Sequence, residues 1–426
     1  MFKRADGIVD FDKSICIGCK ACMAACPYDA IFINPEDHSA EKCNFCAHRI
    51  DMGLEPACVV VCPTEAILIG DMNDPSTKVA NIINREPVMV RRSEKETLPK
   101  LFYKGAHTAT LDPLAARRPE GGLFMWSEQL EGPEMVVSGN PTFNNSSAAA
   151  LLSYDVPHTI PWDWRVSMYT WTKGLATGAY LVPLLLVIFG FMKSDSVLWL
   201  WAAPIAAGAF LAATGALLIW DLEHPGRFYL IFTRPQWKSW LVKGAFIIAG
   251  YSLVLLVHFI STLLGYTRPQ QWLVIAGLPL AVLTAIYTAY LFAQAKARDL
   301  WQNPLLPPHL LLQSVLLGAA ALTPIAFRLE DLLVERLQWI VCIASAIHLL
   351  VVWGELTLTH TTAHARVAVW EMTSGRFSPY FWAGTILTVL GGLAPWLGLG
   401  AAPLALTGVL LYEHAYVQAG QAVPLS

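Results

Sequence analysis

Long apolar runs separated by short polar segments fill the chain from about residue 161 onward. A membrane-spanning helix needs about 20 predominantly apolar residues, and eight stretches come near that length. They are 166–192, 197–220, 240–264, 271–293, 309–328, 334–358, 379–398 and 400–418. Only a Gly/Pro-rich turn separates the last two, which are also compatible with one hairpin. Small residues recur within the runs and aromatic residues cluster near their ends, as close helix packing and a membrane interface require. We therefore predict an all-α membrane bundle of about eight transmembrane helices over 161–426.

The chain before residue 161 has a different pattern. Its apolar pieces are short and β-like, as in AIFINPE, AILIGD, EPVMVRR and KLFYKG. Residues 111–160 are rich in Pro, Gly, Asn and Ser, which is typical of a connector. Within it, GLFMWSEQL is compatible with an interfacial segment or a surface turn. We predict a multidomain protein with a small α+β domain over 1–95 and a connector over 96–160.

Composition agrees with this division. The chain has 426 residues, of which 55% are hydrophobic and 14% are charged. Residues 1–160 hold 36 of the 61 charged side chains. The net charge of −3 argues against nucleic-acid binding. We expect no secretory or twin-arginine signal before the cysteines. In a protein without such a signal, clustered cysteines are more often metal ligands than disulfide partners.

Eight of the nine cysteines lie in two short runs. The first run reads CIGCKACMAACP, with the bacterial ferredoxin spacing C-x2-C-x2-C-x3-C-P. The second reads CNFCAHRIDMGLEPACVVVCP, with spacing C-x2-C-x11-C-x3-C-P. Such spacing predicts [4Fe-4S] clusters, although zinc sites also use C-x2-C pairs. The predicted ligands are Cys16, Cys19, Cys22, Cys26, Cys43, Cys46, Cys58 and Cys62. Cys342 stands alone in an apolar run and is expected to be a packing residue.

The pairing of these ligands depends on whether the eight thiols close two sites by themselves. In that case the fourth cysteine of each run ligates the cluster of the other run. One set is then Cys16, Cys19, Cys22 and Cys62. The other set is Cys43, Cys46, Cys58 and Cys26.

The cysteine segment also resembles a known family. DGIVDFDKSICIGCKACMAACPYDAIFI and EKCNFCAHRIDMGLEPACVVVCPTEAILIGD are similar to the C-terminal half of four-cluster ferredoxin subunits of molybdopterin oxidoreductases. That family carries two further cysteine groups upstream, and the resemblance implies that Cys26 and Cys62 serve clusters completed by those groups. Either this chain is a two-cluster form or its stated start is internal to a longer protein; we expect a shortened N-terminus. The resemblance also implies a molybdopterin-type catalytic partner.

Ionisable side chains at membrane depth cost about 2.5–3.5 kcal/mol, so each is a candidate functional residue. The candidates in the first four predicted spans are Tyr169, Lys173, Asp221, His224, Tyr251 and His258. Lys173 lies four residues after Tyr169 on one helix face, but a lysine there also fits snorkelling to the interface. Asp221 and His224 equally fit an ion-paired helix cap, and His258 equally fits a hydrogen-bonded core histidine.

The sixth predicted span carries His348 and Glu355, seven residues apart and thus on one face. Gln294 and Asp299 flank the end of the fourth span. Together they suggest a proton path through a second bundle, or plain hydrogen bonds between helices. Haem is a rival cofactor, for which His258, His348 and His414 are available as axial ligands.

The apolar segment resembles the NrfD or polysulfide-reductase membrane-anchor family. The similar stretches are PWDWRVSMYTWTKGLATGAYL, DLEHPGRF, FTRPQWKSWLVKGAF and YLFAQAKARDLWQNPLLPPHLL. The resemblance implies an eight-helix protein that exchanges electrons with the quinone pool and carries no haem. We therefore expect an electron-transfer and quinone-interacting subunit of a respiratory oxidoreductase. The alternatives are a structural anchor that passes electrons to a partner cytochrome, and a redox-driven proton pump.

The positive charges predict orientation. An even number of spans places both termini on one side of the membrane. Nine basic residues fall on that side, namely Arg165, Arg227, Arg234, Lys238, Lys243, Lys296, Arg298, Arg366 and Arg376. Four fall on the other, namely Lys193, Arg268, Arg328 and Arg336. The excess predicts a multi-pass protein of the cytoplasmic membrane with its cluster domain in the cytoplasm.

Overall fold

The computed structural model describes residues 1–106, 111, 160–266, 268–358, 360 and 362–423. Its contacts divide it into two units, residues 1–159 with 423–426 and residues 160–422. GLFMWSEQL and most of the predicted connector lie outside the described residues.

The first unit is built from short elements. Its three antiparallel strand pairs are β1 (Phe2–Lys3) with β2 (Val9–Asp10), β3 (Phe32–Ile33) with β4 (Ala40–Glu41), and β5 (Val88–Met89) with β6 (Tyr103–Lys104). Its helices are α1 (Ala21–Ala25), α2 (Ala47–Ile50), α3 (Ala57–Val60) and α4 (Lys78–Arg85). The α+β character that the pattern predicted is confirmed.

Two of the predicted β-like pieces pair with each other, and one forms no strand. EPVMVRR contains β5 and KLFYKG contains β6, so one sheet joins residues on both sides of the expected boundary at 95. AILIGD carries no strand, because no described segment pairs with it. One of its backbone groups turns instead to a cysteine, since the Ala66 N–H donates to the Cys62 sulfur.

A small apolar core supports the first cysteine run. Met23 of α1, Ile31 and Ala40 of β4 are buried together, and the thiols of Cys16, Cys22 and Cys26 pack against them. The second run lacks such cover, since Cys43 and Cys58 are exposed. The two runs therefore sit in different surroundings despite their similar sequences.

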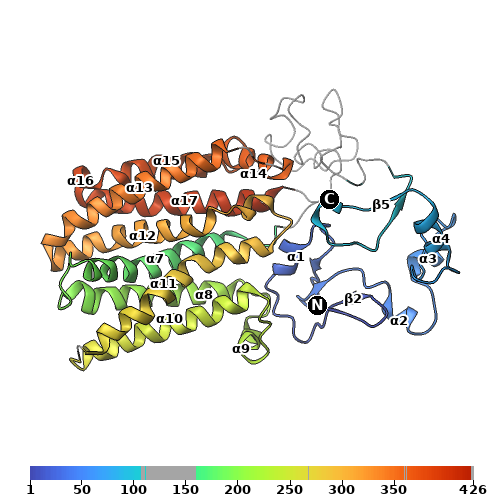
Figure 1. The fold of residues 1–426 in the computed structure, drawn as a ribbon, viewed down its shortest axis with the longest axis horizontal. Helices are drawn as coiled ribbons and strands as arrows, with labels where there is room; N and C mark the ends of the chain where they lie inside the picture. The colour runs from blue at the N-terminus through green and yellow to red at the C-terminus, as the bar shows by residue number, and fades with distance from the viewer. Residues whose placement is uncertain (107–110, 112–159, 267, 359, 361, 424–426) are drawn as a thin grey trace. The chain divides into compact units, whose positions relative to one another are not determined.

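The second unit is a bundle of long helices that lie side by side (Figure 1). They are α7 (Trp164–Ile188), α8 (Ala203–Trp220), α10 (Trp240–Leu263), α11 (Arg268–Gln294), α12 (Leu306–Leu329), α13 (Val334–Thr357), α15 (Ser378–Gly392) and α17 (Ala401–Ala422). A π-helical turn, Leu198–Ala202, leads into α8. The shorter helices are α9 (Leu230–Thr233), α14 (Ala363–Thr373) and α16 (Ala394–Leu397). The predicted membrane bundle is thus confirmed.

Among the described residues, seven segments are long and apolar enough to cross a membrane. The seventh predicted span, 379–398, differs most from expectation. Its helix α15 has 15 residues and ends at Gly392, after which the separate short helix α16 begins at Ala394 with Pro395 in its first turn. Consecutive glycines followed closely by proline favour such a break, because glycine is a poor helix former and proline cannot continue the preceding helix.

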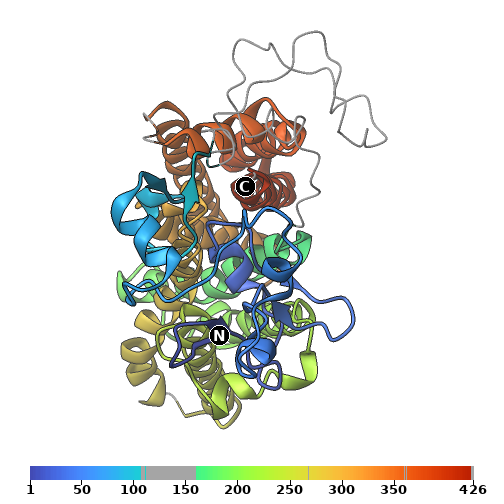
Figure 2. The same ribbon diagram turned by 90° about the vertical axis from the view of Figure 1, so that its right-hand side faces the viewer.

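Helix α7 is the most enclosed of the spans and contacts α8, α11, α12 and α17. Figure 2 shows the same bundle turned by 90°. Glycines set the closest crossing: a Cβ added to Gly178 would lie 1.7 Å from the carbonyl oxygen of Ser314, and one added to Gly318 would meet the backbone of Gly178. The small residues of the apolar runs therefore serve the close packing that they predicted.

Candidate functional site

The first cysteine run wraps around α1. Gly18 and Lys20 both adopt positive φ, which turns the chain sharply before the helix. Cys22 lies in α1 and Cys26 follows its end. The backbone N–H of Ala40 donates to the sulfur of Cys16 at 3.4 Å. Hydrogen bonds of this kind stabilise thiolates and tune iron–sulfur potentials.

The second run uses a similar turn, with Cys46 at positive φ immediately before α2. Cys58 lies in α3, and Cys62 follows it. The Cys62 sulfur accepts the Ala66 N–H at 3.1 Å. Both runs thus present at least one sulfur to a backbone donor.

The electrostatics of the thiols differ between the runs. Burial raises the pKa of the Cys22 thiol to about 12, and the neighbouring Cys19 and Cys16 thiolates add to that rise. Backbone N–H groups, that of Ile67 first, lower the pKa of Cys62.

The thiols fit iron–sulfur clusters by donor chemistry and by their N–H···S bonds. The described residues nevertheless hold no group of three or more His, Cys, Asp or Glu side chains close enough to bind one metal ion.

In the bundle, Lys173 is the centre of the first polar group. Its side chain is 1% exposed, and its Nζ donates to Thr288 Oγ1 at 2.7 Å and to the Ala285 carbonyl at 2.9 Å, both on α11. The Tyr169 hydroxyl reaches the same Thr288 oxygen at 3.4 Å. We call Tyr169, Lys173, Ala285 and Thr288 the lysine cluster. Because the ammonium group ends on a neighbouring helix, Lys173 does not snorkel to the membrane surface.

The other candidates of the first four spans lie elsewhere. Asp221 lies at the end of α8, where its Oδ1 is 3.7 Å from Nε of Arg165, which also pairs with Asp163. This is the ion-paired arrangement at helix ends that the sequence left open. His224 begins the turn that follows and is partly exposed.

His258 and Tyr251 are packed core groups. The Nδ1 of His258 is 3.1 Å from the Tyr180 hydroxyl, and the ring stands edge-on to Trp199 at 4.5 Å. The Tyr251 hydroxyl donates to the Ala176 carbonyl of α7. No hydrogen bond described here joins either side chain to the lysine cluster.

A second polar group lies between α12, α13 and α17. His309 Nε2 is 2.8 Å from His348 Nδ1, and His309 Nδ1 is 3.3 Å from Glu355 Oε1. The same carboxylate accepts hydrogen bonds from Asn303 at 2.8 Å and from the Tyr412 hydroxyl at 2.9 Å. We call these five residues the histidine–glutamate cluster. His348 and Glu355 thus lie on one face of α13, and His309 bridges them.

The remaining candidates, Gln294 and His414, contact residues outside the two clusters. The Gln294 side chain accepts from the Trp240 N–H and donates to the Lys238 carbonyl, so it fastens the start of α10 rather than joining the histidine–glutamate cluster. His414 packs edge-on to Tyr380 at 4.8 Å. The three histidines considered for haem therefore lie on three different helices, α10, α13 and α17.

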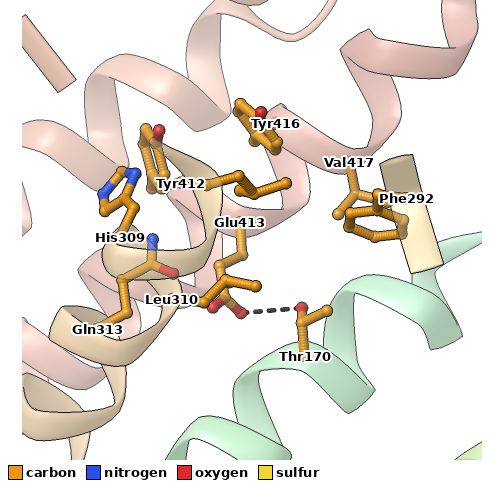
Figure 3. Close-up of a pocket in the computed structure, with 10 residues that line it drawn as sticks. Thr170, Phe292, His309, Leu310, Gln313, Tyr412, Glu413, Tyr416 and Val417 are labelled. Carbon is orange, nitrogen blue, oxygen red and sulfur yellow. Dashed lines mark hydrogen bonds between the residues drawn. The ribbon is translucent and has the colours of Figure 1, made fainter. Parts of the chain in front are cut away.

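A cavity of about 10 Å³ opens between α7, α12 and α17 (Figure 3). Its polar lining comes from Thr170, His309, Gln313, Tyr412, Glu413 and Tyr416. The Thr170 hydroxyl donates to Glu413 Oε2 at 3.0 Å, and Lys173 lies three residues after Thr170 on α7. The cavity therefore adjoins the histidine–glutamate cluster, and Thr170 in its lining lies one helical turn from Lys173.

Several of these residues were not predicted as functional candidates from the sequence. His309 falls at the edge of a predicted span, whereas Glu413 lies inside the last one, 400–418. The cost of a buried carboxylate in an apolar run could have singled out Glu413 as it did Glu355. Asn303, Gln313 and Tyr412 carry no such signal, because their role depends on contacts between helices distant in sequence.

Comparison with known proteins bears on both units. Residues 154–403 match the family described as polysulphide reductase, NrfD, and residues 1–72 match the 4Fe-4S dicluster domain. A tetrathionate reductase subunit of Salmonella typhimurium is 43% identical over 129 residues, which are 30% of this chain and 50% of the relative. A polysulfide reductase subunit of Wolinella succinogenes is 45% identical over 102 residues, 24% of this chain and 53% of the relative.

A third relative is the arsenate respiratory reductase iron-sulfur subunit ArrB of Shewanella sp., which is 33% identical over 151 residues, 24% of this chain and 64% of the relative. The chain spans about half the length of the first two of these relatives. Both resemblances noted in the sequence are confirmed. Since the NrfD match covers more than half of its residues, the chain belongs to the polysulphide reductase NrfD family, and it carries a 4Fe-4S dicluster domain at its N-terminus.

Proposed function

We propose that the protein relays electrons between a catalytic subunit, of the molybdopterin type, and the membrane quinone pool. The observation that carries this proposal is the joining, in one chain, of a 4Fe-4S dicluster domain to a bundle with a buried lysine. The relatives that match the cysteine segment are named as subunits of tetrathionate, polysulfide and arsenate reductases. The catalytic centre would then lie on another chain.

The clusters would be held by the eight cysteines of the two runs. Cys16, Cys19 and Cys22 would hold one cluster, and Cys43, Cys46 and Cys58 another. Cys26 and Cys62 would complete either the opposite cluster of this chain or clusters shared with further cysteine groups. The clusters supply one-electron transfer, while the chain supplies N–H···S bonds that favour the thiolate ligands.

Quinone would react at the lysine cluster. Reduction of a quinone to a quinol takes two electrons and two protons, so its site needs a hydrogen-bond donor and a proton source. The Lys173 ammonium meets both needs, and it is bound by a hydroxyl and a carbonyl that leave it able to donate. Tyr169, on the same face, would orient the quinone oxygen.

The test uses the full chain in lipid vesicles, with its clusters reduced anaerobically and a short-chain quinone added. We expect rapid reoxidation in the wild type and a loss of about 100-fold in Lys173→Met, the scale of a lost general acid. Lys243→Met is the matched control, since that ammonium lies over the Trp240 ring and outside the lysine cluster. Clusters that stay reduced with quinone, yet are oxidised by a cytochrome, would favour the structural anchor instead.

A second function, redox-driven proton pumping, is favoured by the histidine–glutamate cluster. It joins two imidazoles and a carboxylate in one buried array, a composition suited to moving protons. Proteoliposomes that oxidise quinol should then take up fewer protons per electron in Glu355→Gln than in the wild type. An unchanged ratio of protons to electrons in Glu355→Gln would contradict proton pumping through this cluster.

The cluster domain would lie in the cytoplasm, on the side with nine of the thirteen basic residues considered. Labelling of Cys43 and Cys58, which are exposed, by a membrane-impermeant thiol reagent in apo-protein tests this. We expect labelling in inside-out vesicles and none in intact spheroplasts. The reverse pattern would place the domain outside.

A further inference from the structure

The cavity between α7, α12 and α17 contains a buried polar atom that no described residue binds. Gln313 is 2% exposed, and its Oε1 accepts no hydrogen bond from the part of the chain that the structure describes. Leaving a buried polar atom unpaired costs about 1–3 kcal/mol, so such atoms usually bind a protein group or an ordered water. Gln313 lines the cavity, as Figure 3 shows.

The size and lining of the cavity suit one water molecule. About 10–15 Å³ is needed to hold a water, together with two to four polar partners, and the cavity measures about 10 Å³. Glu413 offers a carboxyl group from α17, and Gln313 offers its amide oxygen from α12. Thr170 holds Glu413 from the third side, on α7.

We propose that this cavity binds a water between Gln313 and Glu413, and that the hydrated Glu413 stores the proton that reloads Lys173 after quinone reduction. The second half of this inference rests on the proposed quinone site. Thr170, which binds Glu413, lies one turn before Lys173 on α7, so Glu413 is held on the part of α7 that carries the lysine.

The transfer balances without any redox change in this region. When Lys173 gives a proton to a quinone oxygen, an Nζ–H bond breaks and the neutral amine remains. The Glu413 carboxyl O–H bond then breaks, its proton forms a new Nζ–H bond on Lys173, and the carboxylate that remains is stabilised by the water and by the Thr170 hydroxyl. Gln313 takes no proton and acts as a positioning residue that keeps the water beside the carboxyl.

Infrared difference spectroscopy of the full chain in lipid, recorded on cluster reduction in the presence of quinone, tests the water site. We expect a carboxyl C=O band that is lost in Glu413→Gln and shifted in Gln313→Met, which keeps the length of the side chain but removes the acceptor. Ser314→Ala is the matched control: Ser314 is the next buried residue of α12, and its hydroxyl bonds only within its own helix at Leu310. The control should leave the band in place.

A carboxyl band that does not shift in Gln313→Met, or that shifts equally in Ser314→Ala, would overturn the water site. If Gln313→Met does not fold, H₂¹⁸O exchange of the wild type serves instead. We expect a water O–H band that shifts with the isotope and is absent in Glu413→Gln, and its presence in Glu413→Gln would also overturn the proposal.

The proton-storage role is tested in the same vesicles. Glu413→Gln should slow repeated turnovers with quinone while leaving the first reoxidation of the clusters intact, because only reloading is lost. Equal rates in later turnovers would contradict the role. If wild-type clusters are not oxidised by quinone at all, the quinone proposal fails, while H₂¹⁸O exchange of the wild type and of Glu413→Gln, which needs no quinone, still decides the water site.

Discussion

Only part of the surroundings of Lys173 could be predicted from the sequence. Its spacing from Tyr169 predicted a shared face, and both side chains do reach Thr288. Thr288 itself could not be predicted, because it lies more than 100 residues away and hydroxyls are common in membrane helices. The same holds for His309 of α12, which joins His348 to Glu355, both on α13.

Glu355 is the residue whose removal should cost most stability in the histidine–glutamate cluster. Its carboxylate binds Asn303, His309 and Tyr412, and interhelical hydrogen bonds in membranes contribute about 0.6–2 kcal/mol each. Glu355→Ala should therefore lower the free energy of unfolding by about 2–4 kcal/mol. Unfolding by SDS in mixed micelles measures it.

Glu355→Gln is the matched variant for this experiment, since an amide keeps the shape and an acceptor oxygen. We expect it to retain most of the stability that Glu355→Ala loses. Equal losses in the two variants would mean that charge, rather than hydrogen bonding, holds the cluster.

At the scale of elements, the apolar runs predicted the helices closely. The run 240–264 corresponds to α10, Trp240–Leu263. The run 309–328 began too late, since α12 starts at Leu306 with prolines in its first turn, where a missing N–H costs little. The run 379–398 extended too far, past the Gly-Gly pair that ends α15.

The crossing of α7 and α12 should be highly sensitive to side-chain size. A Cβ at Gly178 would lie 1.7 Å from the Ser314 carbonyl oxygen, which is backbone and cannot move without shifting the helix. We expect Gly178→Ala to reduce the free energy of unfolding by about 2–3 kcal/mol, as overpacking does. Thermal unfolding in detergent, followed by circular dichroism, measures the change.

Gly208→Ala on α8 is the control, because no atom of the described residues lies within 4 Å of the added methyl group. It should be neutral or slightly stabilising, since alanine favours helix more than glycine. If Gly178→Ala unfolds at the same temperature as Gly208→Ala, the close crossing does not contribute to stability.

On the scale of the whole molecule, the division into a cysteine-rich segment and an apolar bundle could be predicted because each has its own pattern and composition. The grouping of the thiols could not, since ligand pairing depends on contacts that spacing alone leaves open. Cys22 and Cys16 lie against one core, whereas Cys58 is exposed on α3.

Iron content should distinguish ligand cysteines from the packing cysteine. Replacing a ligand such as Cys58 by serine should remove about four irons and four sulfides per chain, one [4Fe-4S] cluster. Cys342→Ser in α13 should remove none. Iron and acid-labile sulfide in anaerobically purified protein measure both, and an equal loss in the two variants would contradict the assignment.

Passage of electrons between iron–sulfur clusters and quinone within one chain is the property on which the proposed function depends. The most direct measurement is electron paramagnetic resonance of the full chain in lipid, reduced anaerobically, before and after addition of quinone. We expect reduced-cluster signals that disappear on quinone addition in the wild type and persist in Lys173→Met over the same time. Signals that persist in the wild type, or that vanish equally fast in Lys173→Met, would contradict this function.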